Sequence, residues 1–412
     1  MKEYEAVDGI IDGFREDMVE FARRILSVPA MAPESGGVGE MEKADLILEL
    51  VKDWGFDSVD RFYAPDDRVP GGKRPNYLLT LKGEDSSPPR VWLFAHTDVV
   101  PPGDLDKWTG DPWTLRVDGD RITARGVEDN GQDLISGVFA ARALTTAGIR
   151  PKHDVKIFLV ADEEVGSAKG MHYLVDNHSD LFSEEDLYLV PDAGEPDGSM
   201  IEVAEKSIMW LRIKTIGKQV HASTPGKGIN ANLAAMRLMV SIYDELHERY
   251  GAEDELFDPA GSTFEPTKRE SNVPNINTIP GEDISYLDCR ILPEYDPEEI
   301  LDLIKARGGE IGERYGVKFE FSTHQYEKAA PPTSPDHPVV GILADAVRDV
   351  YGIEAKPMGI GGGTCAAILR RKGYKAAVWS KMEDAAHMPD EFALVSNYIG
   401  DAKVFARIFI GR

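Results

Sequence analysis

The sequence predicts an α/β fold, a mostly parallel sheet with helices, interrupted by an inserted α+β domain. The chain has 412 residues, more than one compact core usually supports. From about Ser207 apolar residues alternate with polar ones, as in a half-exposed strand. Before that point, short apolar segments without alternation are typical of strands buried on both faces in a parallel sheet, and they lie at residues 77–81, 91–95, 155–161 and 187–190.

The first part of the chain intersperses these strands with helices. Apolar residues recur at the helical spacing from Gly9 to Leu26, which predicts one amphipathic helix. A second helix is expected over residues 40–54, with Gly55 as a left-handed stop. Residues 132–147 have the length and alanine content of a crossover helix between two parallel strands.

The middle of the chain predicts a smaller domain with one open sheet face. A helix capped by Asn230 and another starting at Asp296-Pro297 are expected between strands around Met209, at 284–291 and at 318–322. The proline-rich residues 329–338 predict a linker, after which a helix at 339–351 and a buried strand at 376–380 rejoin the first sheet. The expected domains are therefore residues 1–205 with 327–412, and the insertion 206–326.

The composition excludes several classes of partner. Lys and Arg total 46 against 72 for Asp and Glu, a net charge of −26 that repels phosphate backbones and anionic lipid headgroups. Nucleic acid and membrane surfaces are therefore not expected partners. The two cysteines, Cys289 and Cys365, cannot form a disulfide framework, and the first residues lack the basic and apolar segments of a secretion signal. These features predict a cytoplasmic protein.

Residues that bind metals follow the predicted strands, at the edge where open parallel sheets place their sites. Anionic groups gathered in a dry crevice are strongly unfavourable unless a cation neutralises them. We therefore expect a divalent metal ion there. The residues are His96 and Asp98 after one strand, Glu163 and Glu164 after the next, Asp192, Asp129 before a helix, and His387 after the last strand.

The donor types narrow the choice of metal. Imidazole nitrogen with carboxylate oxygen and no thiolate suits zinc, cobalt or manganese better than calcium or magnesium. The donors exceed what one tetrahedral ion needs, so two ions about 3.5–4 Å apart fit better. In an extended chain Asp98 points to the same side as His96 and is placed to fix its tautomer. Glu163 and Glu164 diverge, so that one can bind metal while the other acts as a general base.

Each signal alone also has a purely structural interpretation. A single histidine after a strand is often only hydrogen-bonded, the Asp-Glu-Glu segment at 162–164 can be a solvated loop, and Asp129 with Asn130 and Gly131 can be a turn. Ligand-type residues in five loops at one predicted edge together favour a site.

The motifs LFAHTDVVP, RGVEDNGQ, ADEEVGS and VHASTPGKGINA resemble the co-catalytic zinc peptidase and deacylase family, with the resemblance spanning essentially the whole chain. That family includes glutamate carboxypeptidase, aminoacylase, acetylornithine deacetylase and succinyl-diaminopimelate desuccinylase. The resemblance implies a catalytic di-metal domain with an inserted sandwich-like lid that forms homodimers. It further implies two zinc ions, for which cobalt or manganese can substitute. His96 and Asp192 would hold one ion, Glu164 and His387 the other, and Asp129 would bridge them.

The resemblance also implies roles for residues that bind no metal. Asp98 would orient His96, Glu163 would be the base that activates the bridging water, and His221 in the lid would stabilise the oxyanion in the partner subunit's site. Five residues resemble the family positions that hold the substrate's carboxylate: Asn277, Arg290, Gly362, Gly363 and Thr364. A guanidinium with backbone N–H donors suits that group. Cys365 and the Asn130-Gly131 pair depart from the commoner family pattern, which leaves the substrate open.

The function expected from the sequence is a metal-dependent hydrolase of an amide bond beside a free carboxylate. An N-acyl amino acid deacylase, a desuccinylase and a metallocarboxypeptidase or dipeptidase all satisfy this description. The alternatives are a non-catalytic metal-binding homologue and a two-metal phosphate-ester hydrolase. The glycine-rich residues 359–364 resemble a phosphate loop only weakly, because no Lys-Ser/Thr follows them.

Overall fold

The computed structural model describes residues 2–411. The chain forms two compact units. Unit 1 contains the residues up to Val203, Pro332–Met358 and those from Thr364 onward, and unit 2 contains Ala204–Pro331 and Gly359–Gly363. The sequence placed residues 359–363 with the first domain. They lie in unit 2 because backbone hydrogen bonds join Gly359 N–H to Leu256 O and Lys206 N–H to Ile360 O, at 2.6 and 3.0 Å.

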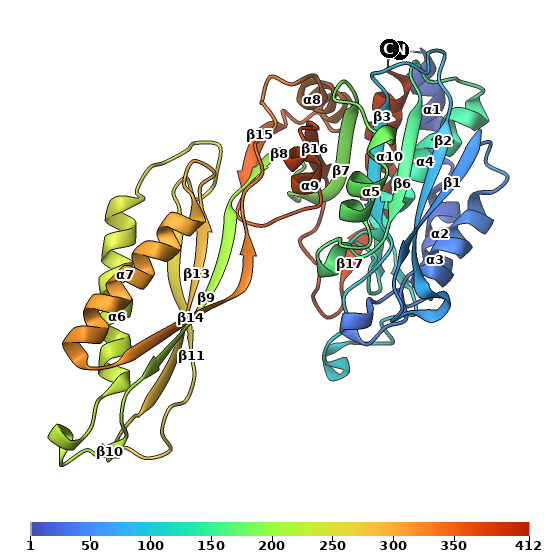
Figure 1. Cartoon of the computed structure of the whole chain (residues 1–412). Helices are drawn as coiled ribbons and strands as arrows, with labels where there is room; N and C mark the ends of the chain where they lie inside the picture. Colours follow the sequence, from blue (N-terminus) through green and yellow to red (C-terminus); the bar gives the residue numbers. More distant parts are fainter. Residues whose placement is uncertain (1, 412) are drawn as a thin grey trace. The chain divides into compact units, whose positions relative to one another are not determined.

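Unit 1 is built on an eight-stranded sheet in the order β1-β2-β6-β3-β7-β16-β8-β15 (Figure 1). The four central strands, β6, β3, β7 and β16, are mutually parallel, so their carboxyl ends meet at one edge. The fold is therefore α/β with a mostly parallel centre, as predicted. The strands are β1 (Ser58–Pro65), β2 (Lys73–Leu81), β3 (Val91–His96), β6 (Val155–Val160), β7 (Leu187–Gly194), β8 (Met200–Glu205), β15 (Lys356–Ile360) and β16 (Ala376–Ser380).

The direction of one strand was predicted wrongly. The segment 77–81 was expected to be parallel because it is apolar without alternation, but β2 is antiparallel to both β1 and β6. Burial on both faces explains the composition in either direction, because β2 is covered like the parallel strands. A small sheet, β17-β5-β4, completes the strands of unit 1 with β4 (Arg116–Asp118), β5 (Arg121–Thr123) and β17 (Phe392–Leu394).

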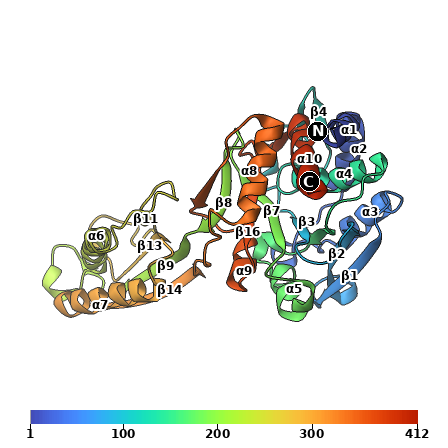
Figure 2. The same cartoon turned by 90° about the horizontal axis from the view of Figure 1, so that it is seen from above.

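Helices cover both faces of the large sheet, as Figure 2 shows. Helices α4 and α10 pack against each other on one face, and α5 and α9 contact each other on the opposite face. Between α5, α9 and the sheet lies a core that contains Trp92, Phe94, Phe158 and Tyr188. The helices are α1 (Lys2–Asp12), α2 (Arg15–Leu26), α3 (Met41–Val51), α4 (Gly131–Ala147), α5 (Met171–Asn177), α8 (Pro338–Tyr351), α9 (Ala366–Arg371) and α10 (Val395–Ile410).

The first predicted helix is in fact two. Helix α1 ends at Asp12 and α2 begins at Arg15, so the break falls at Gly13 and Phe14. Glycine weakens a helix interior by about 1 kcal/mol relative to alanine, and Phe14 leaves the helical conformation with ψ near 3°. The apolar spacing continues through the break, which is why the sequence pattern did not reveal it.

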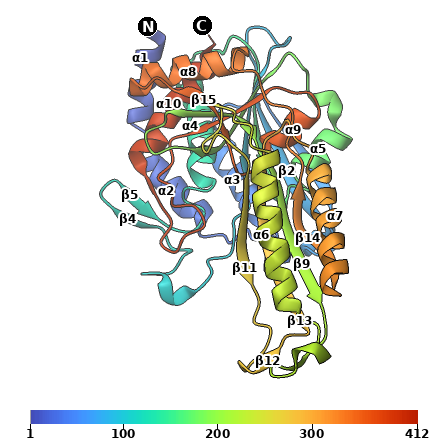
Figure 3. The ribbon, with the colours of Figure 1, turned by 90° about the vertical axis from the view of Figure 1, so that its left-hand side faces the viewer.

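Unit 2 has a four-stranded antiparallel sheet in the order β11-β13-β9-β14, with α6 and α7 on one face (Figure 3). In β9, Met209, Leu211 and Ile213 are buried under these helices while Trp210 is exposed, as the alternation predicted. Strand β11 was not predicted. The elements are β9 (Ser207–Ile216), β10 (Val220–His221), α6 (Ala231–Arg249), β11 (Thr263–Arg269), β12 (Thr278–Ile279), β13 (Glu282–Ile291), α7 (Pro297–Tyr315) and β14 (Lys318–Glu327).

Within residues 2–411, none of the helices combines the length and the apolar character that crossing a membrane requires.

Candidate metal centre

The candidate ligands of unit 1 lie where the central strands end. His96 is the last residue of β3, the 3-10 helix η4 (Glu163–Val165) follows β6, and Asp192 lies near the end of β7. Asp129 immediately precedes α4, and His387 lies in the loop after β16. Because β3, β6, β7 and β16 are parallel, these loops share one edge of the sheet.

Asp129 lies between two imidazoles. One carboxylate oxygen, Oδ1, is 2.8 Å from His96 Nε2, and the other, Oδ2, is 3.0 Å from His387 Nε2. Each imidazole also has a second carboxylate, since His96 Nε2 is 3.3 Å from Asp192 Oδ1 and His387 Nε2 is 3.0 Å from Glu164 Oε2. The arrangement is that of a bridging carboxylate with one histidine and one acid on each side.

Glu163 faces the His96 side of the cluster. Ligand-type atoms of His96, Glu163 and Asp192 all lie within 4.8 Å of one another, and so do those of His96, Asp129 and Glu164. The adjacent glutamates therefore belong to different groups, as expected from their divergence along the chain.

Asp98 acts on the loop that carries both glutamates. Its carboxylate accepts hydrogen bonds from the backbone N–H groups of Glu163 and Glu164, at 3.1 and 3.0 Å. His96 Nδ1 lies 3.5 Å from the Asp98 carboxylate and 3.1 Å from the Asp98 carbonyl oxygen. The imidazole is thus held chiefly by the Asp98 carbonyl oxygen at Nδ1, and this contact orients Nε2 toward the cluster.

The electrostatics of the cluster depend on proton sharing. Hydrogen bonds to Asp129 and Glu164 raise the pKa of His387 to about 10. Burial lowers the pKa of His96, but hydrogen bonds to Asp129, Asp192 and Asp98 outweigh it and raise that pKa well above its usual value. Burial raises the pKa of Glu164 to about 7 and that of Glu163 well above its ordinary range. These four groups thus hold their protons more tightly than they would in water.

The donor set fits divalent metal ions. Two imidazole nitrogens and several carboxylate oxygens converge on a mostly buried edge, where His96 is only 3% exposed and His387 provides the open side at 56%. Both imidazoles present Nε2 toward carboxylates, so ions placed between these atoms would displace the shared protons. Nitrogen with oxygen, without thiolate, is the ligand chemistry of zinc, cobalt or manganese.

Sequence reasoning missed residues that brace the ligand loops. The buried Glu391 carboxylate accepts from the backbone N–H groups of Gly126, Glu128 and Asp129, at 3.0, 3.0 and 3.1 Å, and pairs with the Arg125 guanidinium. The Glu128 carboxylate accepts from the N–H groups of Glu383 and Ala385 in the His387 loop. Asn130 Nδ2 donates to Asp192 Oδ1 at 3.1 Å. The motif RGVEDNGQ revealed only that Glu128 is an acidic residue next to Asp129.

Several residues near the cluster have positive φ although they are not glycine. His387 has φ 63°, Asp384 58° and Asp390 56° in one loop, and Asp162 has 69° immediately before Glu163. Such conformations are uncommon for residues with a Cβ and persist where neighbouring contacts hold them. The hydrogen bonds that the Glu128 carboxylate accepts from Glu383 and Ala385 N–H supply such contacts for the His387 loop.

The remaining predicted residues lie mainly in unit 2. His221 is in β10, where its Nδ1 lies 2.8 Å from Ser223 Oγ, and Asn277 O accepts from Ala222 N–H at 2.8 Å. Arg290 is engaged by Asp288 and by Gly361 O, each at 2.7 Å. Gly362 and Gly363 belong to unit 2 and Thr364 to unit 1. The roles of these residues remain predictions. Cys365 is buried in the core of unit 1.

Comparisons with known proteins agree with this geometry. Residues 92–410 match the family described as peptidase family M20/M25/M40. An uncharacterized metallohydrolase of Methanococcus maripaludis is 37% identical over 95% of this chain and 98% of its own length. The succinyl-diaminopimelate desuccinylase of Paracoccus denitrificans is 26% identical over 95% and 97%.

Among solved structures, human carnosine dipeptidase 1 shares the fold with a TM-score of 0.74 and 17% identity, over 99% of this chain and 98% of that one. The family expected from the sequence motifs is confirmed. The chain belongs to peptidase family M20/M25/M40 and is a metallohydrolase.

Proposed function

We propose that the protein hydrolyses an amide bond beside a free carboxylate, in a small N-acyl amino acid or a short peptide. The observation that carries the proposal is Asp129 between His96 and His387, each with its own second acid, Asp192 or Glu164. This is a donor set for two metal ions rather than one, because a single tetrahedral ion cannot use all five groups.

In this proposal His96 and Asp192 hold one zinc ion, Glu164 and His387 hold the other, and Asp129 contacts both. Cobalt or manganese can take the place of zinc. When bound, such ions polarise a scissile carbonyl and lower the pKa of water toward 7.

Glu163 is the proposed general base. It lies beside His96 and Asp192 in the cluster, and it is not needed to complete either ligand pair. Its carboxylate takes a proton from the attacking water and then donates it to the leaving amine, so that one group serves both steps. Asp98 fixes its position through the Glu163 N–H hydrogen bond. Asp98 is therefore a positioning residue for both His96 and Glu163.

The substrate class rests on the relatives and on unit 2. One relative is named a succinyl-diaminopimelate desuccinylase and a protein of the same fold is named a carnosine dipeptidase, and both names denote hydrolysis of an amide. In this proposal Arg290 and Asn277, with the backbone of Gly362, Gly363 and Thr364, bind that carboxylate. His221 stabilises the oxyanion, from the partner subunit of a dimer.

A hydrolysis screen tests the proposal. N-acetyl and N-succinyl amino acids and dipeptides would be assayed with zinc, cobalt and manganese added separately, beside a chromogenic phosphate ester. We expect amide hydrolysis and none of the ester. Glu163→Gln should keep its metal content and lose about 10²–10⁴-fold in kcat. Cleavage of the ester alone, or a Glu163→Gln variant with the wild-type rate, contradicts the proposal.

A homodimer through unit 2 is part of the proposal. Helix α6 exposes the apolar side chains of Leu233, Met236, Val240 and Tyr243 along one stripe, with Val240 63% exposed. Beside α6 lies β11, an edge strand whose backbone can pair with a second copy. Val240→Glu should dissociate the dimer in analytical ultracentrifugation. Mixing inactive Glu163→Gln and His221→Ala subunits should restore activity, and no recovery would exclude a shared site.

A further inference from the structure

A cavity of about 480 Å³ lies in unit 1 at the amino ends of the central strands. Val91 and Leu187 open β3 and β7, whereas His96 and Asp192 lie near the carboxyl ends of the same strands. With about 3.3 Å per residue, the five steps from Val91 to His96 separate the cavity from the metal centre by about 17 Å. The cavity therefore plays no part in the proposed hydrolysis.

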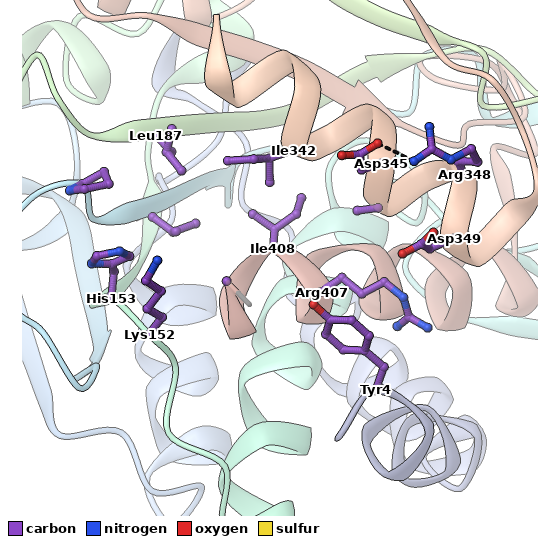
Figure 4. Close-up of a pocket in the computed structure, with 14 residues that line it drawn as sticks. Tyr4, Lys152, His153, Leu187, Ile342, Asp345, Arg348, Asp349, Arg407 and Ile408 are labelled. Carbon is purple, nitrogen blue, oxygen red and sulfur yellow. Dashed lines mark hydrogen bonds and ion pairs between the residues drawn. The ribbon is translucent and has the colours of Figure 1, made fainter. Parts of the chain in front are cut away.

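The middle of the cavity is aliphatic. Figure 4 shows Leu187, Ile342 of α8 and Ile408 of α10 pointing toward one another across it. Ile342 is 38% exposed, in a helix that packs against α10. A volume of this size falls within the range of small-molecule sites.

Polar side chains lie at the two ends of this aliphatic section. Lys152 and His153 stand at one end in Figure 4, and Arg407 and Tyr4 at the other. Within residues 2–411, no protein group lies within hydrogen-bonding or ion-pairing distance of the Lys152 ammonium. His153 Nδ1 and Arg407 Nε are buried without a protein partner. Buried polar atoms of this kind cost about 1–3 kcal/mol each unless something satisfies them.

The charges differ between the two ends. Near Arg407, the guanidinium already pairs with Asp8 at 2.7 Å, Asp345 pairs with Arg348, and Asp349 adds a further negative charge. At the other end the Lys152 charge has no such partner, and the nearby Asp85 is hydrogen-bonded to Ser87. An anion is therefore favoured at the Lys152 end and opposed at the Arg407 end.

We propose that this cavity binds an aliphatic carboxylate, with its carboxylate at Lys152 and His153 and its chain between Leu187, Ile342 and Ile408. The carboxylate accepts hydrogen bonds from the Lys152 ammonium and from the His153 imidazole. The hydrocarbon chain covers the exposed part of Ile342. The site is separate from the metal centre and distinguishes ligands by charge as well as by chain.

Equilibrium dialysis of the full-length, zinc-loaded protein with radiolabelled hexanoate tests this site. Hexan-1-ol and hexylammonium are the matched neutral and cationic probes. We expect hexanoate to bind saturably and at least tenfold more tightly than either. Equal binding of hexan-1-ol would reduce the site to an apolar patch and overturn the proposal, as would the lack of saturable hexanoate binding.

Three variants locate the bound molecule. Lys152→Met should weaken hexanoate binding at least threefold, and Ile342→Asp, which places a negative charge in the aliphatic section, should abolish it. Lys372→Met, at an exposed lysine outside the cavity, should leave it unchanged. Hexanoate held at the metal centre instead would be insensitive to Lys152→Met, and that result would also refute the site. Amide hydrolysis should stay at the wild-type rate in Lys152→Met, which serves as the folding control.

Discussion

Two groups of carboxylates in unit 1 differ in the cation beside them. In the first group each carboxylate has a guanidinium partner. Glu202 and Arg370 pair at 2.7 Å with side chains at most 1% exposed, and Asp186 pairs with Arg90 at the same distance. A guanidinium stays charged at every accessible pH. These pairs therefore have one stable state and hold the sheet together.

The second group, at the carboxyl edge of the sheet, has imidazoles instead. Within residues 2–411 no lysine or arginine forms an ion pair with Asp129, Glu163, Glu164 or Asp192. An imidazole can give up its proton, and a metal ion can replace it. The acids beside arginine therefore have a fixed partner, whereas an added cation could take the place of the imidazole proton beside the others.

The largest expected effect breaks a pair of the first group. Arg370→Met should destabilise the protein by about 3–5 kcal/mol, because it leaves the fully buried Glu202 without a cation. Urea unfolding measures this loss. Lys372→Met, whose side chain forms an exposed pair with Asp176, is the control and should cost little. The double variant Arg370→Met with Glu202→Leu should recover much of the stability, and a single variant near the wild-type value would contradict the structural role.

The second prediction concerns the imidazole group. Free zinc at about 100 times its Kd should stabilise the wild-type protein by about 2.7 kcal/mol, since it binds the folded state. Asp129→Asn should lose this gain, because Asp129 contacts both imidazoles. Asp186→Asn is the matched control from the first group, and it should be less stable yet keep the full zinc effect. Thermal unfolding in zinc-buffered solution measures the zinc effect in both variants. An equal zinc effect in Asp129→Asn and Asp186→Asn would mean that the two groups are equivalent.

Much of the fold was predictable from strand composition. Parallel strands buried on both faces are apolar without alternation, and that pattern located β3, β6, β7 and β16. It could not reveal that β2 is antiparallel, because burial sets the composition and direction does not. The break between α1 and α2 was missed since the apolar spacing runs through Gly13. Short edge strands such as β11 carry little apolar signal.

The candidate ligands were predictable because each follows a recognisable strand or opens a helix. His96, Asp129, Glu164, Asp192 and His387 are brought within contact distance of one another by the parallel sheet. The braces were not predictable, since Glu391 acts through backbone N–H groups more than 260 residues earlier in the chain. Backbone acceptance of this kind has no side-chain pattern in the sequence.

The third prediction joins the two groups. Glu391 has a guanidinium partner, Arg125, but its carboxylate also holds the Asp129 N–H. Glu391→Gln should therefore weaken metal affinity by about 10–100-fold, because it weakens the hydrogen bonding that positions the proposed ligand Asp129. Competition with a zinc chelator measures this affinity. Asp390→Asn, at the adjacent residue of the same loop, contacts Thr109 and Arg116 and should leave the affinity nearly unchanged. Equal weakening in both variants would mean a general loosening of the loop.

The smallest effect tests whether an acid beside arginine still stabilises the fold when its nearest arginine is exposed to solvent. Hydrogen bonds from Arg68, whose side chain is 48% exposed, together with a longer one of 3.4 Å from the buried Arg74, hold the pKa of Asp66 below its ordinary value. A depressed folded-state pKa contributes stability above the unfolded value of about 3.9 and loses it as the pH falls through the folded value. Asp66→Asn should thus be less stable than wild type at pH 7, by less than Arg370→Met because solvent screens Arg68.

Urea midpoints measured from pH 7 to pH 3 check that sign. The difference between wild type and Asp66→Asn should shrink below about pH 4, because the carboxyl group of the unfolded wild-type chain takes up its proton there while the folded carboxylate stays ionised. Asp67→Asn, at the exposed neighbour, is the control and should show little difference at pH 7. A difference that grew on acidification would mean that the ionised carboxylate is the less stable form in the folded protein. Arginine would then not be sufficient to make an acid structural, and burial of the pair would be needed as well.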